Sequence, residues 1–314
     1  IHWEKPNMDV MPGTNIIEKS WRDSNTMWLD KEEENPQKRY KLFNVENTTL
    51  KNSGDRWRMI LKYSVDGIHW SKEVDASDYI ADRSTVFYNP FRKKWIYSIR
   101  NGVRRGDWYS RERNYVENSD PELGTRSLSS SRDIKAKDVN NSKTRYWFGP
   151  DPNEPIHPKF PDVRPAIYNH DAIAYESLLL GFFNVWQGPE NDVCDSLNIQ
   201  KRNELLLGYS RDGFHWHRPD LNRFMAVKET SDAWNFGNIQ SINGVPLIVG
   251  DLLYFYASGR RLNEVMWDSH TSVGLATLRR DGFASMDAGT TEGQLTTRKL
   301  TFDGQYLFVN ANVV

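Results

Sequence analysis

Two stretches of the chain share one phrase: SVDGIHWSKE at residues 64–73 and SRDGFHWHRP at residues 210–219. Both carry Ser, Asp-Gly and His-Trp at identical offsets. The glycine of such a phrase accepts a positive φ, and the aspartate bonds nearby backbone amides, which is typical of a tight turn. We therefore interpret the phrase as a turn that recurs once per structural unit, with its tryptophan packed between units and its histidine in a structural role.

Further copies give the repeat its period. The chain opens on IHWEKP, which matches the second half of the phrase, and weaker copies stand at residues 131–134 and 280–283. The apolar residue after each turn is Ile1, Ile68, Ile134, Phe214 and Phe283, at intervals of 66 to 80 residues. This period suits a four-stranded propeller blade with generous loops, whereas blades of the WD type are shorter.

The segments between the turns have the pattern of β-hairpins. Short runs of β-branched and aromatic residues pair across turn residues at 85–88 with 95–99, 172–175 with 178–183, and 246–249 with 252–256. Helical periodicity is not sustained, although one or two helical turns fit residues 196–207. The sequence therefore predicts an all-β protein.

Composition limits the classes of function. The net charge is −1, so nucleic acid is not an expected partner. The 12 Trp, 14 Tyr and 14 Phe fit either a sugar-binding cleft, where ring faces pack on pyranose C–H groups, or packing between sheets. Cys194 is the single cysteine and is expected to be a small buried residue. No apolar run is long enough to span a membrane.

These residues resemble the five-bladed β-propeller glycoside hydrolases of families 32, 43 and 33 and their bacterial relatives. The phrase S-x-D-G-x-x-W is similar to the sialidase Asp box, one residue shorter. Residues 82–88 resemble the R-D-P-x-V-F segment of families 32 and 43, but Ala81 replaces its Arg and Arg83 its Pro. Residues 169–183 resemble the inner hairpin of the next blade, and residues 274–298 resemble the last blade and the entry into a β-sandwich.

The resemblance implies a five-bladed propeller with four complete blades in this sequence. We expect the propeller at residues 1–288, with blades at about 7–73, 74–140, 141–219 and 220–288. Residues 289–314 are expected to form closing strands or the start of a β-sandwich. The first blade would then precede Ile1 and would carry the nucleophile that family 32 takes from it.

Glycoside hydrolysis requires two carboxyl groups, one protonated and one ionised. Asp82 and Asp171 each stand at the start of a predicted inner strand, where a propeller brings side chains to its central funnel. We expect Asp82 to be the ionised partner and Asp171 the acid, with Glu176 as a substitute acid. Asp30 lies further along an equivalent strand. The alternative is that these aspartates cap turns.

Arginines at strand ends favour an acidic substrate, such as a sialic, ulosonic or uronic acid, because a guanidinium matches a carboxylate. Ordinary surface ion pairing is the alternative. The residues expected to bind substrate are Arg83, Arg100, Arg104, Arg260, His170, Trp186, Asn238 and Gln240.

Two functions therefore compete: a glycosidase and a non-catalytic carbohydrate-binding propeller. Neither requires an organic cofactor, and no metal site is expected from the histidines, while a structural calcium ion held by loop carboxylates stays open. The oligomeric state stays open too. Periplasmic or extracellular placement is expected from the substrate class.

Overall fold

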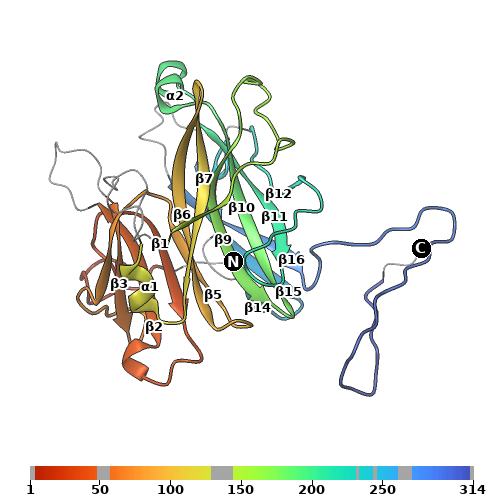
Figure 1. Cartoon of the computed structure of the whole chain (residues 1–314), viewed down its shortest axis with the longest axis horizontal. Helices are drawn as coiled ribbons and strands as arrows, with labels where there is room; N and C mark the ends of the chain where they lie inside the picture. The colour runs from red at the N-terminus through yellow and green to blue at the C-terminus, as the bar shows by residue number, and fades with distance from the viewer. Residues whose placement is uncertain are drawn as a thin grey trace.

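The structure is a computed structural model that describes residues 4–47, 57–128, 144–230, 233–242, 246–260 and 271–311. The copies of the turn expected at Ile1 and Ile134 lie outside these ranges. The described residues form four sheets of four strands each, in the order of the sequence (Figure 1). The fold is an all-β propeller arrangement, as predicted.

Each of the first three sheets consists of strands that follow one another in the chain. The first holds β1 (Arg22–Leu29), β2 (Tyr40–Asn47), β3 (Trp57–Ser64) and β4 (Asp75–Ile80). The second holds β5 (Thr85–Asn89), β6 (Lys94–Arg105), β7 (Trp108–Asn118) and β8 (Arg145–Phe148). The third holds β9 (Ala166–Tyr175), β10 (Leu178–Gly188), β11 (Arg202–Ser210) and β12 (Arg223–Met225).

The fourth sheet differs because its inner edge is split. Both β13 (Ile239–Ile242) and β14 (Leu247–Val249) pair with β15 (Leu252–Arg260), which pairs in turn with β16 (Thr271–Arg279). Three short helices join strands elsewhere: η1 (Pro36–Lys38), α1 (Pro121–Arg126) and α2 (Asn191–Leu197). The helical turns expected at 196–207 are wrong, because α2 ends at Leu197 and β11 begins at Arg202.

Three apolar cores hold neighbouring sheets together face to face. Phe43 and Leu61 of the first sheet pack with Trp95 of the second. Further cores join the second sheet to the third and the third to the fourth. Trp28 of β1 packs against all three cores, which places β1 near the common axis of the sheets.

The two strong copies of the Asp-Gly turn have the same geometry. Each lies between the third and fourth strands of its sheet, and the glycine φ is +78° at Gly67 and +81° at Gly213. In each, the aspartate Oδ1 accepts two backbone N–H groups at 2.8 Å. The repeat is therefore a structural one, and Ile68 and Phe214 occupy equivalent places.

This position of the turn also sets where each sheet ends. The fourth strands β4 and β12 follow their turns and pair with β3 and β11. The sheets therefore run past the blade limits expected at residues 73 and 219. All three predicted hairpins are confirmed as β5–β6, β9–β10 and β14–β15.

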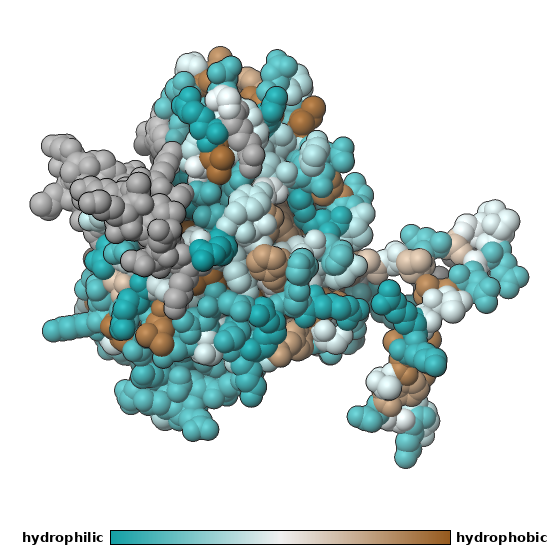
Figure 2. Space-filling view, in the orientation of Figure 1, coloured by the Kyte–Doolittle hydropathy of each residue, from teal (hydrophilic) through white to brown (hydrophobic). Residues whose placement is uncertain are grey.

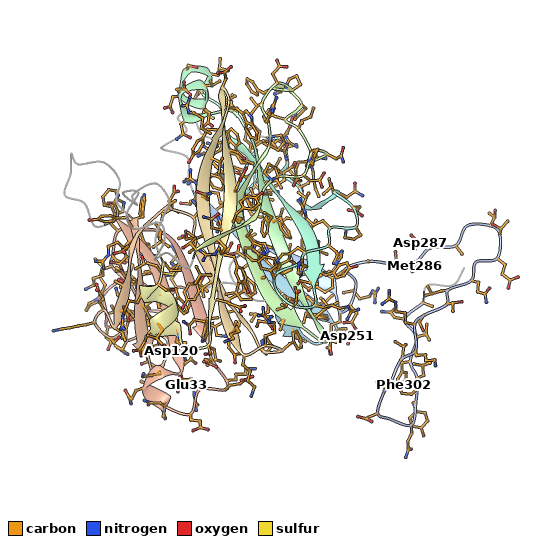
Figure 3. The ribbon with its side chains drawn as sticks, in the orientation of Figure 1. Glu33, Asp120, Asp251, Met286, Asp287 and Phe302 are labelled. Atoms are coloured by element: carbon orange, nitrogen blue, oxygen red, sulfur yellow. The ribbon has the colours of Figure 1, made fainter. Side chains whose placement is uncertain are left out.

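The C-terminal segment leaves the body after the fourth sheet (Figure 1). Residues 289–311, for which closing strands were expected, are exposed throughout and hold no strand in this described range. Met286, Asp287 and Phe302 project from this segment away from the sheets (Figure 3).

Candidate functional site

The first strands of the four sheets meet around a central cavity of about 630 Å³. Its walls come from β1, from the residues that begin β5 and β9, and from β13 and β15. The lining residues that carry chemistry are Asp23, Arg83, Asn169, Asp171, Gln240 and Arg260. Polar groups from four separate sheets are therefore brought to one space.

Hydrogen bonds between neighbouring inner strands align these residues at the same height along the cavity. Thr26 Oγ1 accepts the Val86 amide at 3.1 Å, and Thr85 Oγ1 donates to the His170 carbonyl at 2.6 Å. Thr26 and Thr85 each follow an aspartate by three residues, Asp23 and Asp82 respectively. The two aspartates thus precede equivalent strand positions in adjacent sheets.

Arg83 contacts groups from the other three sheets. Its guanidinium lies 3.2 Å from the Asp23 carboxylate, donates to Gln240 Oε1 at 2.8 Å, and sits 5.3 Å from the Tyr168 ring centre. The Arg83 φ is +54°, a left-handed conformation that costs a non-glycine residue free energy. The Asp23 carboxylate also accepts the Arg83 amide at 3.0 Å, which supports this conformation.

Asp171 has the properties of a proton donor. Burial raises the pKa of its carboxyl to about 7, because desolvation outweighs the opposing effects of Arg113, Arg83 and a hydrogen bond from Asn169 Nδ2 at 3.0 Å. A carboxyl group with such a pKa is substantially protonated at neutral pH.

Asp82, by contrast, is ion-paired. Its carboxylate contacts the Arg100 guanidinium, and the Arg100 amide donates to Ser84 Oγ at 3.2 Å. Asp23 is paired in the same way with Arg83. The cavity lining therefore holds Asp171, whose carboxyl has a raised pKa, and the ion-paired Asp23, whereas Asp82 lies just before β5 and is not part of the lining.

Arg113 of β7 is a functional candidate that the sequence did not reveal. It is fully buried and donates hydrogen bonds to neutral oxygens: Ser98 Oγ at 2.9 Å, the Ser98 carbonyl, and the Arg83 carbonyl at 2.9 Å. Burial lowers the pKa of this guanidinium to about 9, while Asp171 opposes the shift. The buried positive charge of Arg113 thus interacts with the Asp171 carboxyl.

Aromatic and basic side chains also lie together around the start of β9. The Arg111 guanidinium stacks on Trp186 at 4.4 Å and pairs with Glu190 at 2.9 Å. Burial opposes ionisation of Tyr168, but Arg83 and Lys201 overcome it and lower its pKa to about 8. Trp186 and Tyr168 are themselves buried in one cluster.

Several residues expected in the site lie elsewhere. His170 is fully buried among Phe87, Trp147, Phe183 and other rings, because side chains alternate along β9 and Asp171 takes the cavity side. Glu176 is exposed in the left-handed turn at the other end of β9, where it lines a separate cavity with Tyr175 and Phe283.

Other expected residues do not line the cavity either, among them Asp82, Arg100 and Trp186. Asn238 is buried and accepts a hydrogen bond from Asn203 at 3.1 Å. Arg104 is exposed near the tip of the β6–β7 hairpin. Asp30 pairs with the buried Lys41 at 2.9 Å and belongs to the framework of the first sheet.

Asp23 is the lining carboxylate that the sequence prediction missed. The signal that could have found it is the parallel between Asp23-Ser-Asn-Thr and Asp82-Arg-Ser-Thr, two aspartates followed by threonine at the same offset.

Comparisons with known proteins concern the fold. No family model and no curated protein sequence matches the chain. Among solved structures, an N-acetylgalactosamine deacetylase from F. plautii is 14% identical, with a TM-score of 0.51 over 82% of this chain and 72% of that one. A putative glycoside hydrolase from Parabacteroides distasonis is 10% identical, with a TM-score of 0.48 over 84% and 71%.

A β-fructofuranosidase of glycoside hydrolase family 32 from Bombyx mori also matches. It is 12% identical, with a TM-score of 0.49 over 84% of this chain and 48% of that one. At such identities the likeness concerns architecture and does not assign a reaction.

Two properties of the described ranges bear on other classes of function. Within them, no group of three or more His, Cys, Asp or Glu side chains is arranged to hold a metal ion. The helices found there are not long and apolar enough to cross a membrane.

Proposed function

We propose that the chain is the catalytic propeller of a glycoside hydrolase that works by carboxyl acid catalysis. The observation that carries the proposal is the combination of Asp171, with a pKa of about 7, and two ion-paired carboxylates, Asp23 and Asp82, at the inner strands of adjacent sheets. Glycoside hydrolysis requires one protonated carboxyl group and one ionised carboxylate.

In this proposal Asp171 donates its proton to the glycosidic oxygen as the bond to the anomeric carbon breaks. Asp23, which lines the cavity with Asp171, acts on that carbon as nucleophile or through a water molecule as base. Asp82, held by Arg100, stabilises the positive charge that develops on the sugar ring. The Asp82 and Asp171 roles are those expected from the sequence, and Asp23 is added to them.

We further infer an acidic sugar as the substrate. Arg83 and Arg260 line the cavity, and Arg100 lies beside it on β6. A guanidinium can bind a substrate carboxylate through two parallel hydrogen bonds. The deacetylase of similar fold was solved in complex with blood group B trisaccharide, which is consistent with a saccharide ligand. Such a substrate fits a periplasmic or extracellular enzyme.

The test uses methylumbelliferyl and natural glycosides of sialic acid, glucuronic acid, arabinose and fructose. Asp171→Asn, Asp82→Asn and Asp23→Asn should each lower kcat by about 10²–10⁴-fold, the range of acid–base contributions. Glu176→Gln is the matched control, because Glu176 lies at the far end of β9 and should leave kcat unchanged.

The leaving group distinguishes the roles. An activated aryl leaving group needs little protonation, so the loss in Asp171→Asn should be smaller with aryl glycosides than with natural ones. The losses of activity in Asp82→Asn and Asp23→Asn should be similar for aryl and natural glycosides. Binding of saccharide without turnover by the unmodified protein would instead favour the carbohydrate-binding propeller.

A further inference from the structure

A second cleft, of about 480 Å³, lies between the start of β7 and the segment that joins β8 to β9. Its lining differs from that of the central cavity. Its lining includes Trp108, Glu112, Tyr146, Asp151, Ile156 and Arg164.

Contacts within the protein hold the outer wall of this cleft in place without a ligand. Glu154 is buried, pairs with Arg218 of the connection between β11 and β12, and accepts the Asp151 amide at 3.2 Å. Four prolines, at residues 150, 152, 161 and 165, stiffen the same wall. Such a preformed concave surface loses little entropy on binding.

A glycine brings the floor of the cleft close to its polar groups. A Cβ added at Gly149 would lie 3.2 Å from both the Glu112 carboxyl carbon and the Tyr146 hydroxyl. The backbone therefore lies directly against these two groups, and a larger residue would push them out of place. Glu112 itself is 1% exposed.

The chemistry of the cleft suits a sugar ring. Tyr146 is 56% exposed and Trp108 is half-buried, so both offer apolar ring surface for pyranose C–H groups. The Asp151 carboxylate can accept hydrogen bonds from sugar hydroxyls. Arg164 stacks on Trp108 at 5.2 Å and supplies donors.

The charges of the lining residues differ between this cleft and the central cavity. Its lining has two acids against one arginine, whereas the central cavity is lined by three arginines and two aspartates. A second acidic sugar would be repelled here, so the hydroxyl donors of a neutral sugar match the cleft better.

We propose that this cleft is a second saccharide-binding site, which takes a neutral pyranose segment on the faces of Tyr146 and Trp108. The site binds without catalysis. If the proposed hydrolytic function is also right, the cleft holds the enzyme on a polymer while the central cavity acts on one residue of it.

The test measures mobility in native gels that contain soluble galactomannan, xyloglucan or pullulan, with Asp171→Asn as the parent protein so that the polymer is not degraded. At least one of these neutral polymers should retard the parent. Adding Tyr146→Ala should weaken that binding about tenfold, since most of the ring's buried area is lost, whereas Tyr146→Phe should retain it.

Trp21→Ala is the control for loss of an exposed aromatic residue, because Trp21 is 64% exposed and lies outside the cleft. The proposal is overturned if none of the three polymers retards the parent, if Tyr146→Ala migrates like the parent, or if Trp21→Ala weakens binding equally. Thermal melts establish that each variant is folded. Retardation of a protein that shows no hydrolysis would reject the proposed function and leave the second site standing.

Discussion

Asp171 is the proposed general acid, so its pKa predicts how activity depends on pH. Because a general acid must be protonated, kcat/KM should fall about tenfold per pH unit above the pKa of about 7. Removing the positive charge of Arg113, as in Arg113→Met, should move this alkaline limb to higher pH, since Arg113 lowers the Asp171 pKa. A pH–rate profile of each protein checks both expectations, and an unmoved limb would contradict the second.

The same pKa predicts a pH dependence of stability. The folded-state pKa of Asp171 lies above the value of about 3.9 of an unfolded chain, so the folded protein binds this proton more tightly. Stability from this group is therefore present below pH 4 and is lost as pH rises from about 4 to 7. Asp171→Asn lacks this loss, so its melting temperature relative to the unmodified protein should rise across that window in scanning calorimetry.

Residue placement within the site was only partly predictable from the sequence. Asp82 and Asp171 were both expected in the site because each begins a predicted strand, and of the two only Asp171 lines the cavity. His170 and Asp171 were both assigned to the site, although neighbouring side chains in a strand point to opposite faces of the sheet. In the structure, the side chain of His170 is buried among aromatic rings. Arg113 could not be found, because its burial depends on the packing of β7 against the loop before β5.

At the scale of elements, the Asp-Gly turn of the third sheet also joins that sheet to the second. Asn89 Nδ2 donates to the Asp212 carbonyl at 2.8 Å, and Trp147 Nε1 donates to the Phe214 carbonyl at 2.7 Å. A Cβ at Gly213 would lie 2.7 Å from Ile96 Cδ1 and 2.8 Å from Asn89 Nδ2. The turn is thus both a chain reversal and an intersheet contact.

Alanine substitutions of Gly213 and Gly67 distinguish the chain reversal from the intersheet contact. Gly213→Ala should lower the free energy of unfolding by roughly 3–5 kcal/mol, from left-handed strain plus overpacking. Gly67→Ala shares the strain but meets the edge of the Tyr40 ring at 3.0 Å, so about 1–2 kcal/mol is expected. Urea unfolding measures both values, and equal losses would mean that the intersheet contact contributes little.

The elements themselves were largely predictable because local patterns encode them. The three hairpins and the turn were found from alternation and from Asp-Gly spacing. The fourth strands were not predicted: β12 has three residues and lies well beyond its turn, where pairing with β11 rather than propensity defines it.

At the scale of the whole molecule, the sheets are joined in series by three apolar cores, and the outward face of the fourth sheet differs. Leu247, Val249, Leu252 and Val273 lie on that face with exposed fractions from 39% to 68%. Inward residues of the same sheet, such as Leu253 and Phe255, are buried against the third. The outward face of the fourth sheet is therefore an exposed apolar surface.

The C-terminal segment stands apart from all of these interfaces. Figure 2 shows apolar and polar residues alternating along it, beyond the body formed by the sheets. Phe302, Tyr306 and Phe308 are 65%, 77% and 89% exposed. Upstream of it, Phe283 packs on Tyr175 at 5.2 Å between ring centres and so belongs to the body.

Deleting residues 289–311 should therefore leave the propeller intact. We expect a melting temperature within about 2 °C of the unmodified chain, because exposed residues contribute little packing free energy. Ending the chain after Arg280 removes Phe283 as well and should lower the melting temperature by several degrees more. Scanning calorimetry compares the three proteins, and a large loss in the shorter deletion would show that the segment packs on the sheets in solution, as a closing strand would.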